Sequence, residues 1–324
     1  MKQTDYAYSV AYIRSIENRL LTAADIESLI TASDAQSAVQ LLIDKGYGKD
    51  RIDAADFEIL LANQLSECWS ELREILPDGA PLDVLICKND FHNLKVVLKG
   101  LKSGLKSFES CFLTPSVTDP ASLIKGAANA DFADYPEYLR QTAIRANDIL
   151  SRTGDSQLAD TVTDKAAMDY CLDEAKKSGS EFLIKYVILT NTLTDIKIAM
   201  RCVMTDKDAD FVSEALSECC AIDRAELINA VLDGKNALCE LVAKSGFEKE
   251  AAALERSLAE YEKEADSRIT GFLRGAKYIS MGIEPVISYI HSKQTEIQSV
   301  RIIMSGKLIG ADTEQIRSRL RELV

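Results

Sequence analysis

Hydrophobic side chains recur at helical spacing along most of the chain. One such stretch stops at Pro77, a residue that a helix interior does not tolerate. Its apolar residues are Leu60, Leu61, Leu65, Trp69, Leu72 and Leu76, and from Leu61 onwards they are three or four positions apart. The stretch 181–203 shows the same periodicity over a greater length. No run of alternating apolar and polar residues bounded by turn residues predicts a β-strand, so we expect an all-α fold.

A third stretch, residues 248–266, carries many charges and one narrow apolar stripe. The stripe consists of Leu254, Leu258, Tyr261 and Ala265, which are three or four positions apart. A narrow stripe in a charged sequence is typical of a single helix on a protein surface.

Three of the predicted helical segments can be overlaid on one another. They start at residues 93, 195 and 299, so the two separations are 102 and 104 residues. The first six positions of each segment follow one order: small polar, aliphatic, basic, aliphatic, small or aliphatic, and Leu or Met. Such near-equal spacing predicts three copies of a helical unit of roughly a hundred residues. We place these repeats at 1–112, 113–213 and 214–324, with the loop-like segment Thr114–Pro120 at the first boundary.

A basic residue occupies the same position in each segment: Lys95, Lys197 and Arg301. On a helix, this residue leaves a different face from the aliphatic residues beside it. If the three copies pack around a common axis, the three bases occupy pseudo-equivalent places from which they could contact a partner. The alternative is that each base pairs with a carboxylate of its own unit, for example Asp90 in the first or Glu296 in the third.

Composition narrows the class of protein. The chain has 324 residues and a net charge of −13, which argues against a general nucleic-acid binder. With 15 Gly, 6 Pro and 47% hydrophobic residues, the chain is expected to be folded and helix-rich. The first residues carry no apolar signal core, and no stretch of about 18 apolar residues is present. We therefore expect a cytoplasmic protein that does not span a membrane.

The eight cysteines show no C-x-x-C motif and no regular framework. In a chain without an export signal they indicate reduced thiols. Cys219 and Cys220 are adjacent, so they form either a redox-active pair or, as we favour, two free thiols on a helix.

No sequence motif indicates catalysis. The segment Gly100–Ser107 resembles a phosphate-binding loop but has Leu105 where the lysine is needed. The two histidines, His92 and His291, have no metal ligand at a suitable spacing, and no nucleophile motif is present. We therefore predict no catalytic site, no cofactor and no metal.

One enzymatic alternative remains open. Asp169 and Asp173 lie on one helix face, and the stretch 147–155 resembles the N-D-x-x-S-x-x-x-E magnesium motif of terpene synthases. The two motifs stand in the reverse order, however, and aromatic residues make up only 6% of the chain. A magnesium-dependent diphosphate enzyme is thus the weaker interpretation.

The C-terminal part of the chain carries a more specific pattern. It reads Glu284-Pro285, then Tyr289, then Lys293, Glu296-Ile297, Val300-Arg301 and Ile303. Similar elements occur earlier, at Tyr8 to Leu21, Gly46-Tyr47-Gly48, Asp90 to Lys99, Asp164 to Tyr170 and Asp195 to Arg201. In order and spacing they resemble the family of C subunits of V/A-type rotary ATPases, whose vacuolar member is known as the d subunit. In the third repeat Ser299 replaces the Asn or Asp of the first two.

The resemblance implies an all-helical funnel of three similar domains with pseudo-threefold symmetry. It also implies a non-catalytic central-stalk subunit, present as one copy on the cytoplasmic face of the membrane. Such a protein couples the rotating shaft to the proteolipid ring of an H⁺- or Na⁺-translocating ATPase or ATP synthase, and it meets the membrane only through the ring. A helical scaffold for another complex is the alternative. The candidate partner-contact positions are Asp90, Asn93, Lys95, Asp195, Lys197, Glu296 and Arg301.

Overall fold

The computed structural model describes residues 2–48, 52–105, 107–218 and 221–321. Within these ranges the chain forms α-helices and short 3-10 helices joined by loops, and it contains no β-strand. The prediction of an all-α fold is confirmed. Cys219 and Cys220 lie outside the described residues, so the prediction about this pair is not tested.

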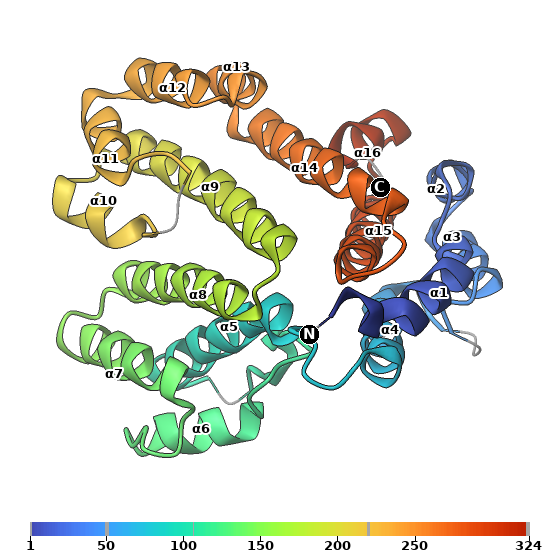
Figure 1. Ribbon diagram of the computed structural model, residues 1–324, viewed down its shortest axis with the longest axis horizontal. Helices are drawn as coiled ribbons and strands as arrows, with labels where there is room; N and C mark the ends of the chain where they lie inside the picture. The colour runs from blue at the N-terminus through green and yellow to red at the C-terminus, as the bar shows by residue number, and fades with distance from the viewer. Residues whose placement is uncertain (1, 49–51, 106, 219–220, 322–324) are drawn as a thin grey trace. The chain divides into compact units, whose positions relative to one another are not determined.

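The chain divides into two compact units, and the first joins both ends of the sequence. It consists of Met1–Ala80 and Asp266–Val324, drawn in blue and red in Figure 1. The N-terminal part contains η1 (Gln3–Tyr6), α1 (Ala7–Ile16), η2 (Glu17–Arg19), α2 (Ala23–Thr31), α3 (Ala35–Asp44), η3 (Ala54–Asp56) and α4 (Phe57–Ile75). The C-terminal part contains η5 (Gly275–Tyr278), α15 (Glu284–Leu308) and α16 (Thr313–Arg319).

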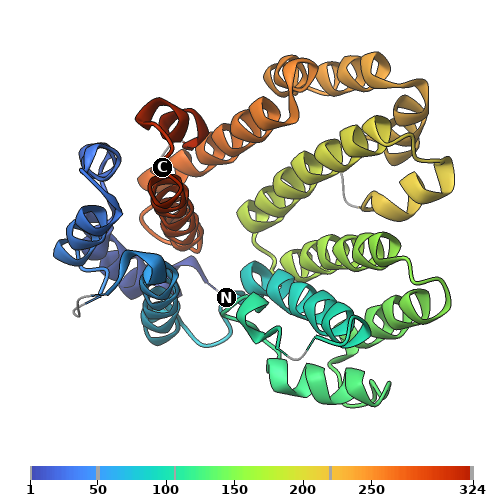
Figure 2. The same cartoon turned by 180° about the vertical axis from the view of Figure 1, so that it is seen from behind.

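Both parts contribute to one hydrophobic core in this unit. Leu29, Leu42 and Leu61 of the N-terminal part pack with Val300 and Ile303 of α15. The α4 and α15 helices lie side by side in both views of the ribbon (Figures 1 and 2).

The second unit is continuous and spans Pro81–Ala265. Its helices are α5 (Asp83–Lys102), η4 (Glu109–Cys111), α6 (Pro120–Ala128), α7 (Glu137–Arg152), α8 (Ser156–Ser178), α9 (Glu181–Met204), α10 (Ala209–Ala215), α11 (Arg224–Asp233), α12 (Lys235–Lys244) and α13 (Glu248–Arg256). The boundary between the units falls within α14 (Leu258–Arg274). One core of this unit is formed by apolar side chains of α5, α6, α7 and α8, among them Leu94, Leu123 and Leu139.

Polar side chains fix where many of the helices begin. Thr22 and Asp25 form a capping box at α2, with N–H···O distances of 2.9 and 3.2 Å. An N-cap side chain also accepts a backbone N–H at eight other α-helices in the described ranges, and these residues are Asp34, Asp119, Asp155, Ser180, Asp208, Asp223, Ser257 and Asp312. Each such cap stabilises its helix by about 1 kcal/mol.

The single helix predicted over 248–266 is wrong. The structure has two helices there, α13 and α14, because Ser257 is extended, with φ −163° and ψ 158°. The Ser257 hydroxyl accepts the backbone N–H of Glu260 at 3.1 Å, so it starts the second helix. The apolar stripe is also buried against another helix. Tyr261 is 1% exposed, and its hydroxyl donates to the Leu193 carbonyl of α9 at 2.6 Å.

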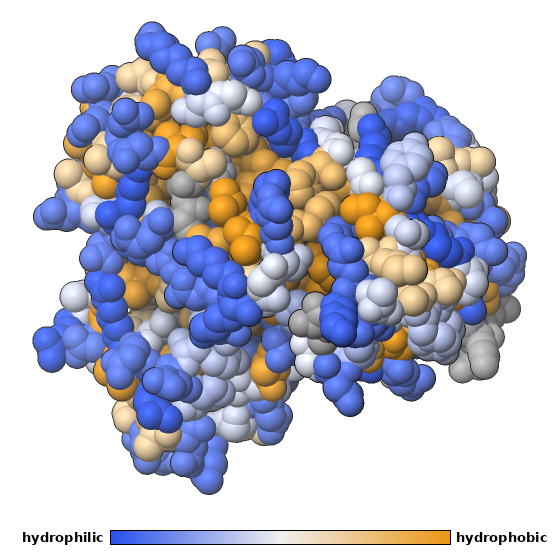
Figure 3. Space-filling model, in the orientation of Figure 1, coloured by the Kyte–Doolittle hydropathy of each residue, from blue (hydrophilic) through white to orange (hydrophobic). Residues whose placement is uncertain are grey.

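The predicted repeat boundaries, 1–112, 113–213 and 214–324, and the pseudo-threefold funnel stay predictions. The division into two units describes which parts pack together, which is a separate property from internal repetition. The surface in Figure 3 is covered largely by hydrophilic side chains, with apolar groups in smaller areas among them.

Candidate functional site

Two buried polar side chains of α5 hold the loop that precedes α6. Asp90 accepts the backbone N–H groups of Val117 at 3.0 Å and Thr118 at 3.2 Å. Asn93 accepts the Leu113 N–H at 2.8 Å and donates to the Leu113 carbonyl at 3.0 Å. Both side chains are 0% exposed, and burial raises the pKa of Asp90 although these hydrogen bonds oppose the shift. The loop is therefore fixed to the helix by side chains that solvent does not reach.

The α9 helix holds the loop before α11 in the same way. Asp195, 102 positions after Asn93, accepts the Ser217 N–H at 3.1 Å and also the Ser217 hydroxyl. Thr192, 102 positions after Asp90, accepts the Ala221 N–H at 2.8 Å. Asp195 is 0% exposed, and its burial raises the pKa to about 6 against the opposing bonds from Ser217.

In the first unit, α15 holds the loop before α2, which comes from the other end of the chain. Glu296 accepts the backbone N–H of Leu21 and the hydroxyl of Tyr47. Lys293 donates to Glu296 at 2.6 Å, and its ammonium group lies 4.8 Å from the centre of the Tyr47 ring. Burial is the main cause that raises the pKa of Tyr47, and the Glu296 carboxylate adds to it.

The same helix position thus holds a loop in α5, α9 and α15. Asp90, Thr192 and Glu296 each accept an N–H from a residue one or two positions before a helix N-cap, which is Asp119, Asp223 or Thr22. The departure at Ser299 has a visible consequence. Its hydroxyl donates to the Thr295 carbonyl of its own helix at 2.9 Å, so it holds no loop.

The three basic residues lie on partly exposed helix faces. Each pairs with a carboxylate of the same compact unit, but in every case that carboxylate lies outside the base's own predicted repeat. Lys95 contacts Asp164 at 2.5 Å, and Lys197 lies 3.7 Å from Glu262. Arg301 makes two bonds to Glu58, at 2.7 and 2.9 Å. The carboxylates belong to the long helices α8, α14 and α4.

The carboxylates first suggested as partners, Asp90 and Glu296, bind the loops instead. As solvent-exposed ion pairs, the three pairs contribute about 0–1 kcal/mol each. The three bases can therefore exchange their present partners for others at little energetic cost.

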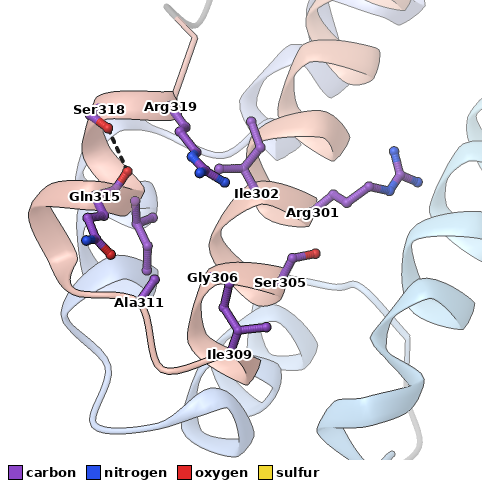
Figure 4. Close-up of a pocket in the computed structure, with 10 residues that line it drawn as sticks. Arg301, Ile302, Ser305, Gly306, Ile309, Ala311, Gln315, Ser318 and Arg319 are labelled. Carbon is purple, nitrogen blue, oxygen red and sulfur yellow. Dashed lines mark hydrogen bonds between the residues drawn. The ribbon is translucent and has the colours of Figure 1, made fainter.

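A groove of about 420 Å³ lies between α15 and α16 (Figure 4). Its lining includes Ile302, Ile309 and Ile316, together with the two arginines Arg301 and Arg319. Ile309 is 77% exposed. The groove therefore combines apolar surface with two guanidinium groups on an otherwise acidic chain.

Two acidic residues of the magnesium alternative have other roles in the structure. Asp169 accepts the Glu218 N–H at 2.9 Å, and Asp148 pairs with Arg152 at 2.7 Å. In the part of the chain that the structure describes, no group of three or more His, Cys, Asp or Glu residues is arranged to hold a metal ion. Nor does any helix in these ranges combine the length and the apolar character that crossing a bilayer requires.

The candidate positions predicted from sequence included neither Thr192 nor Lys293, although Lys293 belongs to the C-terminal pattern. Thr192 was detectable in principle, because it lies 102 positions after Asp90 in the overlaid segments. The Glu296–Leu21 contact was not, because it joins residues 275 positions apart.

The structure therefore defines an all-helical protein whose long helices hold loops through buried polar side chains. Residues 9–319 match the family described as ATP synthase (C/AC39) subunit, so the chain belongs to that family.

Curated relatives agree over almost the whole length. The C subunit of the V-type sodium ATPase of Enterococcus hirae is 21% identical over 96% of both chains. The C subunit of the A-type ATP synthase of Methanocaldococcus jannaschii is 26% identical over 98% of this chain and 86% of its own. The corresponding A-type ATP synthase protein of Haloferax volcanii is 22% identical over 92% and 88% of the two chains.

The resemblance to the C subunits of V/A-type rotary ATPases is thus confirmed. The family consists of accessory subunits of rotary ATPases, so the chain is a non-catalytic subunit and its partners are other subunits of such a complex. The seven candidate contact positions stay predictions. Asp90, Asn93, Asp195 and Glu296 are at most 1% exposed, whereas Lys95, Lys197 and Arg301 are accessible.

Proposed function

We propose that the chain is the central-stalk subunit that couples the rotating shaft of a V/A-type ATPase or ATP synthase to the membrane proteolipid ring. The observation that carries this proposal is the family match over residues 9–319, together with relatives named as the C subunit of both V-type and A-type enzymes. On this proposal the chain sits on the cytoplasmic face and reaches the membrane only through the ring. The transported ion is H⁺ or Na⁺.

The loops held by α5, α9 and α15 support a mechanical role. A protein that transmits torque must resist deformation when the load passes through it. Loops anchored by buried hydrogen bonds resist displacement, because leaving a buried carboxylate or amide without its partner costs about 1–3 kcal/mol or more. Several such loops distribute the load over several contacts.

The first test is purification of the tagged chain from gently solubilised membranes. We expect proteolipid, shaft and nucleotide-binding subunits to be recovered with it in constant proportion. Recovery of the chain alone, or with unrelated proteins, would contradict the coupling role and favour a scaffold in another complex.

A second test concerns the three accessible bases. The triple variant Lys95→Glu, Lys197→Glu and Arg301→Glu places acidic groups where the proposal expects partner contacts. We expect recovery of shaft or ring subunits to fall at least roughly tenfold, because like charges that face each other across an interface cost several kcal/mol. Normal recovery with a folded triple variant would show that the bases have no role in binding.

The control for this variant restores the ion pairs inside the chain. It combines the three reversals with Asp164→Lys, Glu262→Lys and Glu58→Lys, so that each pair is present with its charges exchanged. If the bases act only through these pairs, the control regains binding. If they contact a partner, binding stays low while the thermal unfolding midpoint returns toward that of the unmodified chain.

A further inference from the structure

Within the second unit, α5 and α8 pack antiparallel in a constant register. Lys99 contacts Asp160 at 2.8 Å, and Lys95 contacts Asp164 one turn further along. The same interface continues to Cys87 and Cys171, whose Sγ atoms are 3.0 Å apart. Along the interface the residue numbers on α5 fall from 99 to 87, while those on α8 rise from 160 to 171. The three contacts therefore lie along one antiparallel helix pair (Figures 1 and 2).

The two thiols are buried and closer than ordinary neighbours. Cys87 is 1% exposed and Cys171 is 0% exposed, although 84 positions separate them in the sequence. Their distance is below the roughly 3.5–4.0 Å that suits non-bonded heavy atoms. It exceeds a disulfide bond, at about 2.05 Å, by only about 1 Å. A small displacement of the side chains would bring the sulfurs to bonding distance.

An aromatic cluster fixes the position of the pair. Phe91 lies one turn after Cys87 on α5, and Tyr170 directly precedes Cys171 on α8. Their ring centres are 6.0 Å apart, and Tyr138 stacks on Tyr170 with centres 4.4 Å apart. Because these closely packed rings hold the two helices against each other, the thiols have little freedom to separate.

The two sulfurs differ in chemical character. A hydrogen bond with the Cys87 thiol lowers the pKa of Cys171, although burial opposes the shift. The same bond, together with burial, raises the pKa of Cys87. Cys171 is therefore the better nucleophile of the pair, since the thiolate is the reactive form.

We propose that Cys87 and Cys171 form a redox modification site, at which a hydroperoxide converts the two thiols to a disulfide that cross-links α5 to α8. The Cys171 thiolate attacks a peroxide oxygen, the O–O bond breaks, and Cys171 becomes a sulfenic acid. The hydroxide that leaves hydrogen peroxide takes up the proton that the Cys171 thiol gave up and becomes water. The Cys87 sulfur then attacks the Cys171 sulfur, the S–S bond forms, and the hydroxyl leaves as water with the Cys87 proton. The two thiols lose two electrons and two protons in total, and hydrogen peroxide takes up both to give two molecules of water.

The cross-link has two measurable consequences. Because both sulfurs are buried, we expect them to react more slowly than the exposed Cys111. Because the bond closes a long loop, it restricts the unfolded chain. We expect the thermal unfolding midpoint to rise by about 5–10 °C on oxidation.

The test uses the full chain with Cys111→Ser, which removes the exposed thiol among the described cysteines. The folded protein is treated with hydrogen peroxide, the remaining thiols are alkylated in denaturant, and a digest without reductant is analysed by mass spectrometry. We expect a peptide pair that joins Cys87 to Cys171, which disappears on treatment with dithiothreitol. Its yield should follow the rise of the unfolding midpoint.

Cysteine variants provide the matched controls. Cys87→Ser and Cys171→Ser should lose both the peptide pair and the rise of the midpoint, whereas Cys68→Ser, which removes another buried thiol, should keep both. If a serine variant does not fold, Cys87→Ala serves the same purpose. Recovery of Cys87 and Cys171 as alkylated thiols from the folded Cys111→Ser chain, after an exposure many times longer than the one that fully oxidises Cys111 in the unmodified chain, overturns the proposal.

Discussion

The buried polar side chains of α5, α9 and α15 are matched to backbone groups that lack a helical partner. The first N–H groups at and before a helix start have no carbonyl of their own helix to bind. Asp90, Thr192 and Glu296 supply an acceptor at three such places. A buried carboxylate is costly unless it is hydrogen-bonded, so each side chain and its loop need one another.

Asp195 links this arrangement to pH. Its pKa is about 6 in the folded chain and 3.8 ordinarily, so the folded state binds the proton more tightly than the unfolded state. The stability that comes from protonated Asp195 is therefore complete below about pH 4 and is lost as pH rises to about 6. At about 1.4 kcal/mol per pKa unit, the loss reaches about 3 kcal/mol.

The substitution Asp195→Asn removes this dependence, because an amide does not ionise in this range. We expect the free energy of unfolding of the unmodified chain to fall by up to about 3 kcal/mol, relative to this variant, between pH 4 and pH 7. Urea unfolding at the two pH values measures the difference. The variant also loses one acceptor oxygen, but the effect of that loss on the free energy of unfolding is the same at both pH values. Only the difference in this free energy between the two pH values therefore reports on the ionisation of Asp195. The exposed Asp148→Asn controls for the lost charge, and an equal difference at both pH values would refute the assignment.

The Lys293–Glu296 pair shows how far a residue's role follows from sequence. The two positions are one helical turn apart, so the 2.6 Å contact between them could be foreseen. Their burial, at 5% and 1% exposed, and the contacts of Glu296 with Leu21 and Tyr47 could not. Those contacts join residues 275 and 249 positions apart, and helical periodicity carries no information about such partners.

Among the helices, the approach of α16 to α15 depends on one residue without a side chain. A Cβ atom at Gly306 would lie 2.7 Å from Cγ1 of Ile316 and 3.0 Å from its Cδ1. Ile316 is 3% exposed and belongs to the core of the first unit. Its side chain therefore cannot retreat without opening a space in that core.

The variant Gly306→Ala should displace α16. We expect a loss of about 1–3 kcal/mol in the free energy of unfolding, as is typical of overpacking. Gly271→Ala is the matched control, because Gly271 also lies in a helix but a Cβ there meets no atom within 4 Å. It should stabilise the chain by up to about 1 kcal/mol, from helix propensity alone. Equal effects of the two substitutions, measured by urea unfolding, would contradict a tight contact at Gly306.

On the scale of the whole molecule, the first unit is assembled from the two ends of the chain. Its core combines Leu29, Leu42 and Leu61 from the N-terminal part with Val300 and Ile303 from α15. The buried Glu296–Leu21 contact joins the same two parts. Neither part can bury its apolar face alone.

This division predicts how fragments behave. Residues 1–80 and residues 258–324, each expressed alone, should show little helical circular dichroism and no cooperative unfolding. Expressed together, they should copurify and unfold cooperatively, because association restores the shared core. The second fragment starts at residue 258 so that it contains the whole of α14. Independent cooperative folding of either fragment would contradict the shared core as the source of their stability.

The sequence by itself determined the all-α class, the extent of α4 and α9, the three overlaid segments and the resemblance to a rotary ATPase family. These features follow from local periodicity and from residues in a fixed order, both of which a linear chain displays. Local periodicity also led to the wrong prediction of one helix in place of α13 and α14, because the apolar stripe continues across the extended Ser257.

Only the tertiary structure decided which groups the polar side chains meet. Asp90, Thr192, Asp195 and Glu296 bind backbone groups of loops, and Cys87 meets Cys171 across 84 positions. The physical reason is that a helix fixes the face on which a side chain lies, whereas its partner depends on how separate helices pack. That packing is decided by the burial of apolar surface over the whole chain.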